Sequence, residues 1–229
     1  ERGAEHGEGG QQRGGLVVAR EEDQREDGDG GGGVDVEVVE LDRGADRRGG
    51  RTAEARTRCR GYVAAVARPE DVPLTALNYS ESVAKWGQEF VEEQWLKANN
   101  EAFSWHPEQG GWDIDRLHRG MEADWFDPAD LLFLWDTAGD PVLAGFHWTK
   151  WHAEEAPGFG EVYVVGLAAD YRGKKLGGPL LQIGLRRMVE KGAQRVILYV
   201  EADNDPALKA YERLGFEVDE EHVVWGVCD

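Results

Sequence analysis

The segment DYRGKKLGGPLL, residues 170–181, contains the residue types that bind phosphate groups. Arg172, Lys174 and Lys175 carry positive charge, and the glycines among them allow backbone N–H groups to converge. A helix that begins here would add roughly half a positive charge at its N-terminus. The segment therefore predicts a loop that binds a nucleotide-containing cofactor, although a strand-to-helix turn with solvated charges explains it equally well on its own.

Two common nucleotide-binding loops are excluded by the order of residues in this segment. The stretch GKKLGG lacks the Gly-Lys-Ser/Thr ending of the Walker loop. The segment also does not match the dinucleotide fingerprint GxGxxG. If it binds phosphate, it does so as a different kind of turn.

The first 60 residues differ in composition from the rest of the chain. All nine Trp, six Tyr and seven Phe residues lie from Tyr62 onward, whereas residues 1–60 are dominated by Gly, Glu, Asp and Arg. Such a segment buries too little apolar surface to offset the entropy lost on ordering, and its one strand-like run, VDVEVVELD, would stand alone. We expect disorder in residues 1–60, a lead-in over 61–87 whose structure the sequence does not indicate, and a single folded domain over 88–229.

Charge and hydropathy exclude several classes of partner. The formal net charge of −19 argues against nucleic acid, whose phosphates require a basic surface. No apolar run approaches the roughly 20 residues of a membrane span, and the polar N-terminal segment does not resemble a secretory signal. Cys59 and Cys228 are not in metal-ligand spacing, so neither a metal site nor a disulfide framework is predicted. We expect a cytoplasmic protein, of an oligomeric state that the sequence does not indicate.

The folded part reads as an α/β domain on a mixed sheet. Apolar residues at helical spacing indicate helices, and short runs of β-branched and aromatic residues bounded by Gly and Pro indicate strands. The helix after the basic loop has Pro179 in its first turn and Gly192 at its end. The predicted order is helix 88–103, helix 112–121, a hairpin of strands 130–136 and 142–150, strand 160–170, the helix that ends at Gly192, strand 195–203, helix 205–215 and strand 222–227.

Two segments, VVGLAADYRGKKLGGPLL and EADNDPALKAYERLGF, together resemble the GNAT acetyltransferases. In that family an Arg/Gln-x-x-Gly-x-Gly/Ala loop wraps the pyrophosphate of acetyl-CoA. Arg172 matches the first position of the pattern and Gly177 the last, while Lys175 replaces the central glycine. The resemblance implies a single-domain GNAT fold, acetyl-CoA as co-substrate and no metal.

A narrower resemblance extends over residues 95–225. The stretches AFSWHPEQGGW, WFDP, LAGFHWTK, GEVYVVGL and LYVEADN are similar to the C-terminal, catalytic half of the mycothiol synthase family. That family has two tandem GNAT domains and transfers acetyl from acetyl-CoA to the cysteinyl amine of cysteinyl-glucosaminyl-inositol. The resemblance implies a small-molecule amine acceptor of this type. Residues 1–60 cannot form the family's first GNAT domain, so two alternatives stay open: a GNAT that acetylates another small amine, and a non-catalytic acyl-CoA-binding module.

The resemblance also assigns two catalytic roles. Acetyl transfer from a thioester to an amine requires a neutral amine and a proton for the departing thiolate, and an α-amino group titrates near 8, so a base must take its proton. Glu161 matches the family's base and Tyr211 its acid. From residue type alone, Glu161 would be an exposed carboxylate at a strand end and Tyr211 an aromatic residue of the core.

Further positions match the family's binding contacts. The backbone of residues 165–167 would bind the acetyl and pantetheine part. The residues that match acetyl-CoA contacts are Val165, Gly166, Leu167, Arg172, Gly173, Lys174, Lys175, Leu176, Gly177, Gly178, Asn204, Asp205, Pro206, Ala207, Leu208 and Lys209. The residues that match acceptor contacts are Glu108, Lys150, Glu161 and Tyr199. His106 and His147 have no surroundings typical of a triad or a metal site, so we expect structural roles for both.

Lys175 is the main departure from the family's loop pattern. It lacks the freedom of glycine at positive φ. If this position requires a left-handed backbone, strain of about 1–2 kcal/mol would weaken acetyl-CoA binding by about tenfold. Its positive charge acts in the opposite direction, so we expect a working but weakened phosphate loop.

Overall fold

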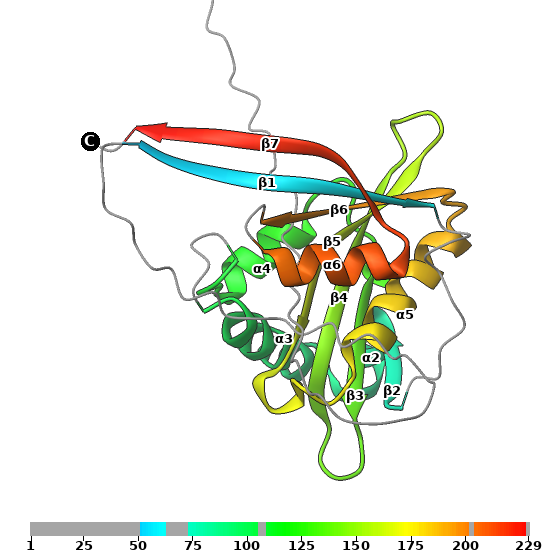
Figure 1. Ribbon diagram of the computed structural model, residues 1–229. Helices are drawn as coiled ribbons and strands as arrows, with labels where there is room; N and C mark the ends of the chain where they lie inside the picture. Colours follow the sequence, from blue (N-terminus) through cyan, green and yellow to red (C-terminus); the bar gives the residue numbers. More distant parts are fainter. Residues whose placement is uncertain (1–50, 63–72, 105–108, 202–203, 228–229) are drawn as a thin grey trace, which may run out of the picture.

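A seven-stranded mixed sheet forms the centre of the computed structural model, which describes residues 51–62, 73–104, 109–201 and 204–227 (Figure 1). The strand order is β2-β3-β4-β5-β6-β1-β7. The strands are β1 (Arg51–Tyr62), β2 (Thr75–Asn78), β3 (Leu131–Asp136), β4 (Val142–His152), β5 (Phe159–Leu167), β6 (Arg195–Glu201) and β7 (Glu217–Val227). The α/β architecture on a mixed sheet that the sequence predicts is confirmed.

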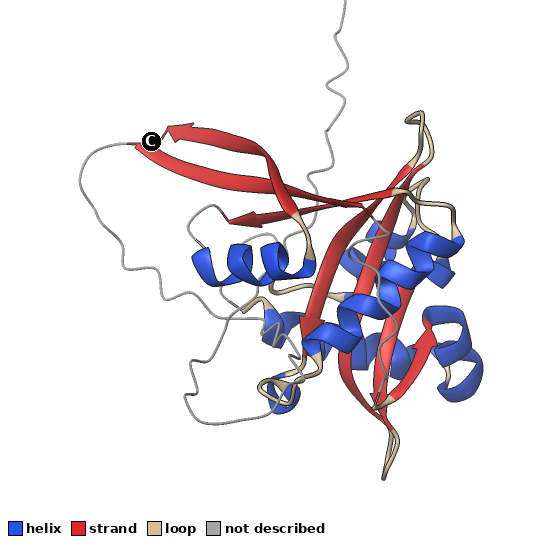
Figure 2. Cartoon of the chain, turned by 45° about the vertical axis from the view of Figure 1, so that its right-hand side comes forward, coloured by secondary structure: helices blue, strands red, loops and turns tan. Residues whose placement is uncertain are grey.

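Helices cover both faces of the sheet (Figure 2). The helices are α2 (Tyr79–Trp86), α3 (Gln88–Ala102), α4 (Ile114–Met121), α5 (Gly177–Glu190) and α6 (Asp205–Leu214), with short 3-10 turns η1 (Pro128–Asp130) and η2 (Ala169–Tyr171). α5 and α6 pack over one apolar core, and α2, α3 and α4 over a second core on the other face. None of the helices in the described ranges is both long enough and apolar enough to cross a membrane.

Local sequence explains where most of these helices begin. Asn78 and Glu81 form a reciprocal capping box at the start of α2, with bonds of 2.9 and 2.8 Å. Asp113 caps α4 and Asn204 caps α6 through side-chain oxygens. α6 ends at Gly215, which has a left-handed φ of 96°. The predicted helix boundaries agree with these ends to within two or three residues.

Strand β1 corrects the expectation that residues 1–60 are disordered. Residues 51–60 belong to this strand, which lies between β6 and β7 and is antiparallel to both. Strand β2 and helix α2 likewise occupy the segment 61–87, so the folded domain begins before residue 88. The strand-like run VDVEVVELD lies outside the described residues.

Composition alone does not reveal β1 because backbone pairing with strands far along the chain contributes to holding it in place. Its backbone pairs with β7 from Arg51 to Arg60 and with β6 from Arg56 to Tyr62. The Arg58 guanidinium also forms ion pairs with Asp219 at 2.7 Å and Glu220 at 2.8 Å. Backbone bonds on both edges of a strand do not require aromatic residues.

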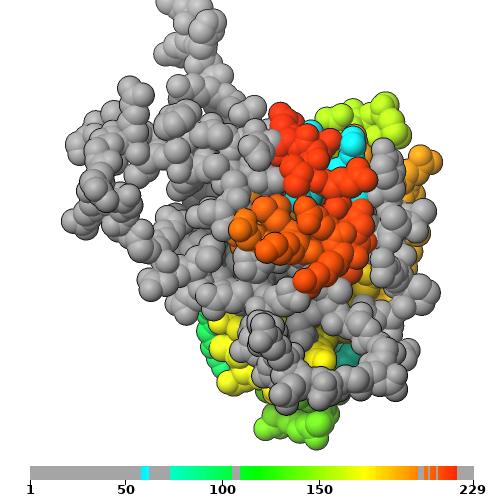
Figure 3. Space-filling model, viewed as in Figure 1, coloured from blue at the N-terminus to red at the C-terminus, as the bar shows by residue number. Residues whose placement is uncertain are grey.

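The sheet opens between β5 and β6. These two strands are parallel and pair only at Gly160–Val162 with Val196–Leu198, with no ladder beyond those positions in the part of the chain that the structure describes. Figure 1 shows β6, β1 and β7 crossing at a steep angle to β3, β4 and β5. Helix α6 lies at the surface below β7 (Figure 3). The edge of β5 that faces β6 therefore has no strand partner from residue 163 onward, which leaves backbone groups there for another partner.

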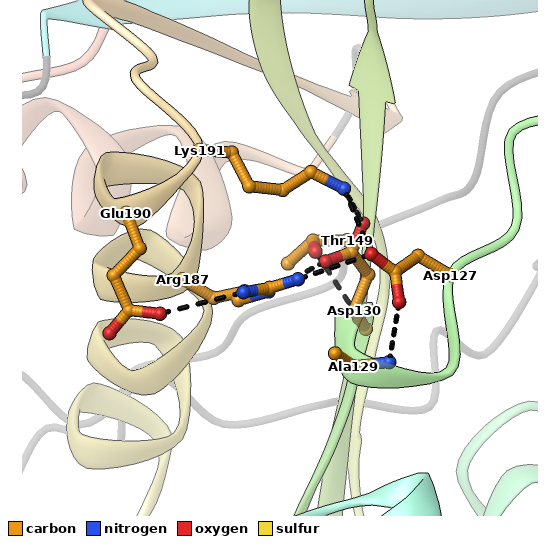
Figure 4. A network of polar contacts seen from close by, with 7 residues as sticks. All are labelled: Asp127, Ala129, Asp130, Thr149, Arg187, Glu190 and Lys191. Atoms are coloured by element: carbon orange, nitrogen blue, oxygen red, sulfur yellow. Dashed lines mark hydrogen bonds and ion pairs between the residues drawn. The ribbon is translucent and has the colours of Figure 1, made fainter.

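An ion-pair network fixes α5 against the sheet (Figure 4). The Asp130 side chain is 2% exposed and accepts a hydrogen bond from Arg187 Nε at 2.7 Å. Lys191 also pairs with Asp130, and both basic residues reach Asp127. Removing one member of a buried ion pair leaves an uncompensated charge. The network thus ties the C-terminal end of α5 to the turn that precedes β3.

His147 is a residue of the core, as expected for a structural histidine. It is fully buried on β4, its Nδ1 lies 3.1 Å from the Leu180 carbonyl oxygen of α5, and it packs against Gly184. Burial lowers the pKa of its imidazole to about 4, a shift that the hydrogen bond to Leu180 partly opposes. The other histidine expected to be structural, His106, lies outside the described residues.

Acidification is expected to destabilise the protein through His147. Between pH 6.5 and 4 the unfolded chain binds a proton at this histidine and the folded chain does not, so the free energy of unfolding falls as the pH falls through that window. The loss attributable to His147 should reach about 3 kcal/mol. Urea unfolding at a series of pH values would measure it. His147→Asn should remove that part of the slope, and a variant with an unchanged slope would contradict the assignment.

Candidate active site

The start of α5 forms the candidate phosphate site. α5 has no side-chain cap and no acidic residue in its first turn, whereas α2, α4 and α6 each begin with a capping Asn or Asp. The first N–H groups of α5 and the positive end of its dipole are therefore left for an anion. Lys174 and Lys175 are exposed directly before this helix. The strand, basic loop and helix predicted from the sequence are all present.

Lys175 adopts the left-handed backbone that the family's glycine would favour. Its φ is 57°, and no other non-glycine residue in the described ranges has a positive φ. Gly173, two residues earlier, also has a positive φ, of 69°. A side chain with a Cβ at such a φ costs about 1–2 kcal/mol. The sequence predicts strain here if this position requires a left-handed backbone. Lys175 has such a backbone, so the loop contains that strain.

Two substitutions of Lys175 separate the effect of its backbone strain on acetyl-CoA affinity from the effect of its positive charge. Lys175→Gly removes both, whereas Lys175→Ala removes the charge and keeps the Cβ at φ 57°. We expect Lys175→Gly to bind acetyl-CoA more tightly than the wild type, by up to about tenfold, and Lys175→Ala to bind it more weakly. Isothermal titration calorimetry of the three proteins would measure the difference. Equal affinities of the glycine and alanine variants would refute the role of strain, because these two variants differ in the Cβ at φ 57° and share the loss of charge.

Arg172 anchors the loop. Its guanidinium donates to the main-chain carbonyl oxygens of Glu101 at 2.9 Å and Leu167 at 3.4 Å. These bonds join the loop to the C-terminal ends of α3 and β5. The predicted contact of Arg172 with phosphate stays a prediction, and the geometry gives this residue a second role in holding the loop. The remaining loop positions differ in exposure: Gly173 is exposed, and Leu176, Gly177 and Gly178 are buried.

The two predicted cofactor segments meet at one edge of the sheet. Because β5 and β6 are parallel, their carboxyl ends lie on the same side. Residues 165–167 end β5 beyond the point where the strands separate, and residues 204–209 begin α6 just after β6. Asn204 is buried and its side-chain oxygen accepts the Ala207 N–H at 3.2 Å, so it caps α6, while its Nδ2 has no hydrogen-bond partner among the described residues. Asp205 and Lys209 are exposed and Leu208 is partly buried.

Tyr211, the predicted acid, lies in the apolar core on the face of the sheet that α5 and α6 cover. Its side chain is fully buried in the core that includes Val162, and its hydroxyl has no hydrogen-bond partner among the described residues. Burial raises its pKa far above the usual range, so the hydroxyl stays protonated. A buried hydroxyl without a partner is rare in folded proteins. It fits a site where a ligand atom accepts the hydrogen bond.

Glu161 lies on the other side as a potential base. It directly precedes Val162 on β5, and since side chains alternate along a strand, it points away from the core that holds Tyr211. Its side chain is 2% exposed, contrary to the exposed carboxylate that residue type suggests. Oε2 lies 2.7 Å from Nε2 of His152, and Oε1 is buried without a hydrogen-bond partner in the part of the chain that the structure describes. One carboxylate oxygen is thus fixed and the other is left for a ligand.

Two predicted acceptor residues adjoin Glu161. Lys150 of β4 is directly opposite Glu161 in the strand register, and its Nζ lies 5.1 Å from the ring centroid of Trp125. Tyr199 of β6 is half-buried, and burial together with the negative charge of Glu161 raises its pKa, while a hydrogen bond from Arg58 opposes the rise. The structure therefore brings Lys150, Glu161 and Tyr199 together.

The fourth predicted acceptor residue, Glu108, lies outside the described residues. The chain that follows it is held firmly against α3. Asn99 Nδ2 donates to the Gln109 carbonyl oxygen at 2.7 Å, and Asn100 makes two bonds of 2.8 Å with the backbone of Trp112. These asparagines thereby anchor residues 109–112 to α3.

The sequence analysis missed three residues of the site: His152, Trp125 and Arg58. His152 follows Lys150 by two positions, and this spacing on a strand places both side chains on the same face. Lys150 is opposite Glu161 in the β4–β5 register, so Glu161 lies on that face as well. The alternation of side chains in HWTKWH could therefore have predicted that His152 lies near Glu161. Arg58 lay in a segment that composition assigned to disorder. No signal in the sequence indicated the ring of Trp125 beside Lys150.

The arrangement is suited to group transfer between two ligands. A buried carboxylate at the end of the β5–β6 ladder and a buried, protonated phenol of α6 lie on opposite faces of the sheet. Beyond residue 162 the edge of β5 that faces β6 has no ladder partner among the described strands, so N–H groups on that edge could stabilise a developing oxyanion. Within the described part of the chain, no group of three or more His, Cys, Asp or Glu side chains could hold a metal ion.

The chain is similar to known acetyltransferases in sequence. The model of the acetyltransferase (GNAT) family matches residues 89–216. The mycothiol acetyltransferase of Corynebacterium aurimucosum is 72% identical over 169 residues, which cover 70% of this chain and 56% of that protein. The mycothiol acetyltransferase of Corynebacterium efficiens is 59% identical over 155 residues, which cover 68% of this chain and 50% of that protein. The chain thus spans about half the length of the curated relatives it matches.

Solved structures share the fold. A GCN5-related N-acetyltransferase from Sphaerobacter thermophilus has a TM-score of 0.54 at 18% identity, over 78% of this chain and 53% of that one. A GNAT-family acetyltransferase from Novosphingobium aromaticivorans has a TM-score of 0.52 at 20% identity, over 78% of this chain and 66% of that one. At these identities the likeness concerns the fold alone.

Proposed function

The chain belongs to the acetyltransferase (GNAT) family, and on that basis we propose that it transfers an acetyl group from acetyl-CoA to the cysteinyl amine of cysteinyl-glucosaminyl-inositol, forming mycothiol. One observation carries the proposal: the buried Glu161 presents an unpartnered oxygen beside Lys150 and Tyr199, next to the opening in the sheet. The name shared by the most similar relatives supports this acceptor.

The residues of the loop and of α6 fit acetyl-CoA as co-substrate. The uncapped start of α5, with Lys174 and Lys175 before it, would hold the pyrophosphate. The edge of β5 at residues 165–167 would bind the pantetheine arm, and residues 204–209 would line the other side. When bound, acetyl-CoA supplies an acetyl group activated as a thioester. The orphaned hydroxyl of Tyr211 supports a ligand atom at that place.

Glu161 would act as general base. Its Oε1 takes a proton from the cysteinyl ammonium, which leaves a neutral nitrogen able to attack the thioester carbonyl. Lys150 and Tyr199 orient the hydroxyl-rich remainder of the acceptor through hydrogen bonds. Burial keeps water away from the carboxylate and strengthens its interaction with the ammonium.

Tyr211 would act as general acid. As the C–N bond forms and the C–S bond breaks, its hydroxyl gives a proton to the departing sulfur. The second N–H proton of the attacking nitrogen replaces the proton that Tyr211 donates, and Glu161 releases the ammonium proton to water when the products leave, so both residues return to their starting states. Backbone N–H groups of residues 165–167 stabilise the negative charge that develops on the carbonyl oxygen, a contribution of about 3 kcal/mol for a well-aimed donor.

One observation also supports a small amine other than cysteinyl-glucosaminyl-inositol as the acceptor. The described acceptor side chains are an ammonium, a carboxylate and a phenol, which recognise amines and hydroxyl groups in general. Another small amine would satisfy them equally well. The third interpretation, a non-catalytic acyl-CoA-binding module, would not need a buried base on one face and a protonated phenol on the other.

Mass spectrometry of reaction products tests the proposal. The purified chain is given acetyl-CoA with cysteinyl-glucosaminyl-inositol, and in parallel with simpler amines, with Glu161→Gln as the control. We expect acetylation of the cysteinyl nitrogen that the control lacks. Acetylation of the simpler amines alone would replace the proposed acceptor. Binding of acetyl-CoA without acetylation of any amine would refute the enzymatic role.

A further inference from the structure

We infer that His152 is a positioning residue for Glu161, holding one carboxylate oxygen so that the other faces the amine acceptor. The inference rests on the proposed function of Glu161 as the base. His152 Nε2 lies 2.7 Å from Glu161 Oε2, and the two side chains are 14% and 2% exposed. The pair belongs to neighbouring strands, β4 and β5, which fix the separation of their backbones.

Contacts on several sides hold the imidazole ring of His152. Its face stacks on Phe159 with centroids 4.4 Å apart and planes at 17°. Phe159 is itself covered by the Arg195 guanidinium, 4.4 Å from its ring centroid. Nδ1 of His152 lies 3.3 Å from Oε1 of the exposed Glu154. The ring therefore cannot turn away from Glu161 without losing these contacts.

The contact with His152 satisfies one of the two carboxylate oxygens of Glu161. Oε2 accepts the hydrogen bond from His152, while Oε1 is buried and has no partner. A buried carboxylate oxygen without a hydrogen bond is unfavourable unless a ligand completes it. The pairing thus decides which oxygen the acceptor meets and in which direction its lone pairs point.

A second histidine–carboxylate pair in the same chain shows the contrast. His118 Nε2 lies 3.1 Å from Oε2 of Glu92, which is 5% exposed. Oε1 of Glu92, however, accepts hydrogen bonds from Tyr79 at 2.7 Å and from Gln88 at 2.9 Å. Both oxygens of Glu92 are satisfied within the protein, so this pair is structural. Of these two buried pairs, the pair at Glu161 is the one that keeps an oxygen without a partner among the described residues.

Two substitutions of His152 separate positioning from packing. The side-chain nitrogen of His152→Gln can occupy the place of Nε2 and donate to Glu161, whereas that of His152→Asn falls near the place of Nδ1 and cannot reach it. We expect His152→Asn to lower kcat by about 100-fold and His152→Gln by less than about tenfold, with the affinity for acetyl-CoA unchanged in both. His118→Asn is the matched control and should keep the kcat of the wild type.

Steady-state kinetics with saturating acetyl-CoA, together with proton NMR of the ring N–H groups, would decide the matter. A hydrogen-bonded ring N–H resonance of His152 should be present in the wild type and shifted in Glu161→Gln. An active wild type whose His152→Asn and His152→Gln variants lose activity equally, or not at all, would overturn the inference and leave the proposed function standing. Absence of the resonance would also overturn it. A wild type that acetylates no amine would instead refute the proposed function, and this inference with it.

Discussion

Glu161→Gln is expected to lower kcat for acetyl transfer by about 1,000-fold and to leave acetyl-CoA affinity unchanged. Glutamine has the same shape, and its amide oxygen can still accept the hydrogen bond from His152 that Oε2 accepts now. What it loses is the ability to take a proton at the position of Oε1, which has no protein partner. Single-turnover kinetics with pre-bound acetyl-CoA would measure the chemical step directly.

The control for this variant is Glu93→Gln, at an exposed position on α3, which should retain full activity. Tyr211→Phe tests the other side of the opening and should also lower kcat, since it removes the buried hydroxyl without changing the packing of the ring. A Glu161→Gln variant that keeps more than a tenth of the wild-type rate would show that another group takes the proton.

Deletion of residues 1–62 is expected to abolish cooperative folding. It removes β1, which pairs with β7 over Arg51–Arg60 and with β6 over Arg56–Tyr62. β7 would then have no strand neighbour in the described sheet, and β6 would keep only its short parallel ladder with β5. Natural domains are stable by about 5–15 kcal/mol, which is less than the loss of an internal strand would cost. Circular dichroism during urea unfolding should show no sigmoidal transition.

A chain that lacks only residues 1–50 is the matched control, because it keeps every described strand. We expect it to unfold at the same urea concentration as the full chain. A narrower variant, Arg58→Met, removes the ion pairs with Asp219 and Glu220 and should lower the free energy of unfolding by about 1 kcal/mol, since the Arg58 side chain is 28% exposed. A fully cooperative transition without β1 would contradict the structural role given to this strand.

The elements that could be predicted from sequence are those with a strong local pattern. Helix α3, the hairpin of β3 and β4, and helix α6 with Asp205 at its start and Gly215 at its end agree with their predicted limits to within a few residues. Each depends on contacts between residues close in sequence. β1 does not, because its partners lie more than a hundred residues away, and local composition contains no information about them.

The candidate site, like the fold, could be predicted from sequence where it depends on local motifs. The basic loop and the identity of Glu161 followed from motifs, and the left-handed φ of Lys175 agrees with the glycine of the family's pattern. The burial of Glu161 and its pairing with His152 depend on the β4–β5 register, which no single segment specifies. Motifs therefore indicate candidate residues, whereas the electrostatic surroundings of those residues come from tertiary structure.

The place of β1 in the sheet also affects how the protein is made. Arg58 of β1 pairs with Asp219, 161 positions along the chain, so the first described strand can be enclosed only after β7 has left the ribosome. Contacts at such separation close slowly, and sheets that depend on them expose unpaired edges in the meantime. A ribosome stalled shortly before residue 217 should display β1 unpaired with β7 and accessible to chaperones. The sheet of this chain can thus be completed only once β7 has been synthesised, however early β1 leaves the ribosome.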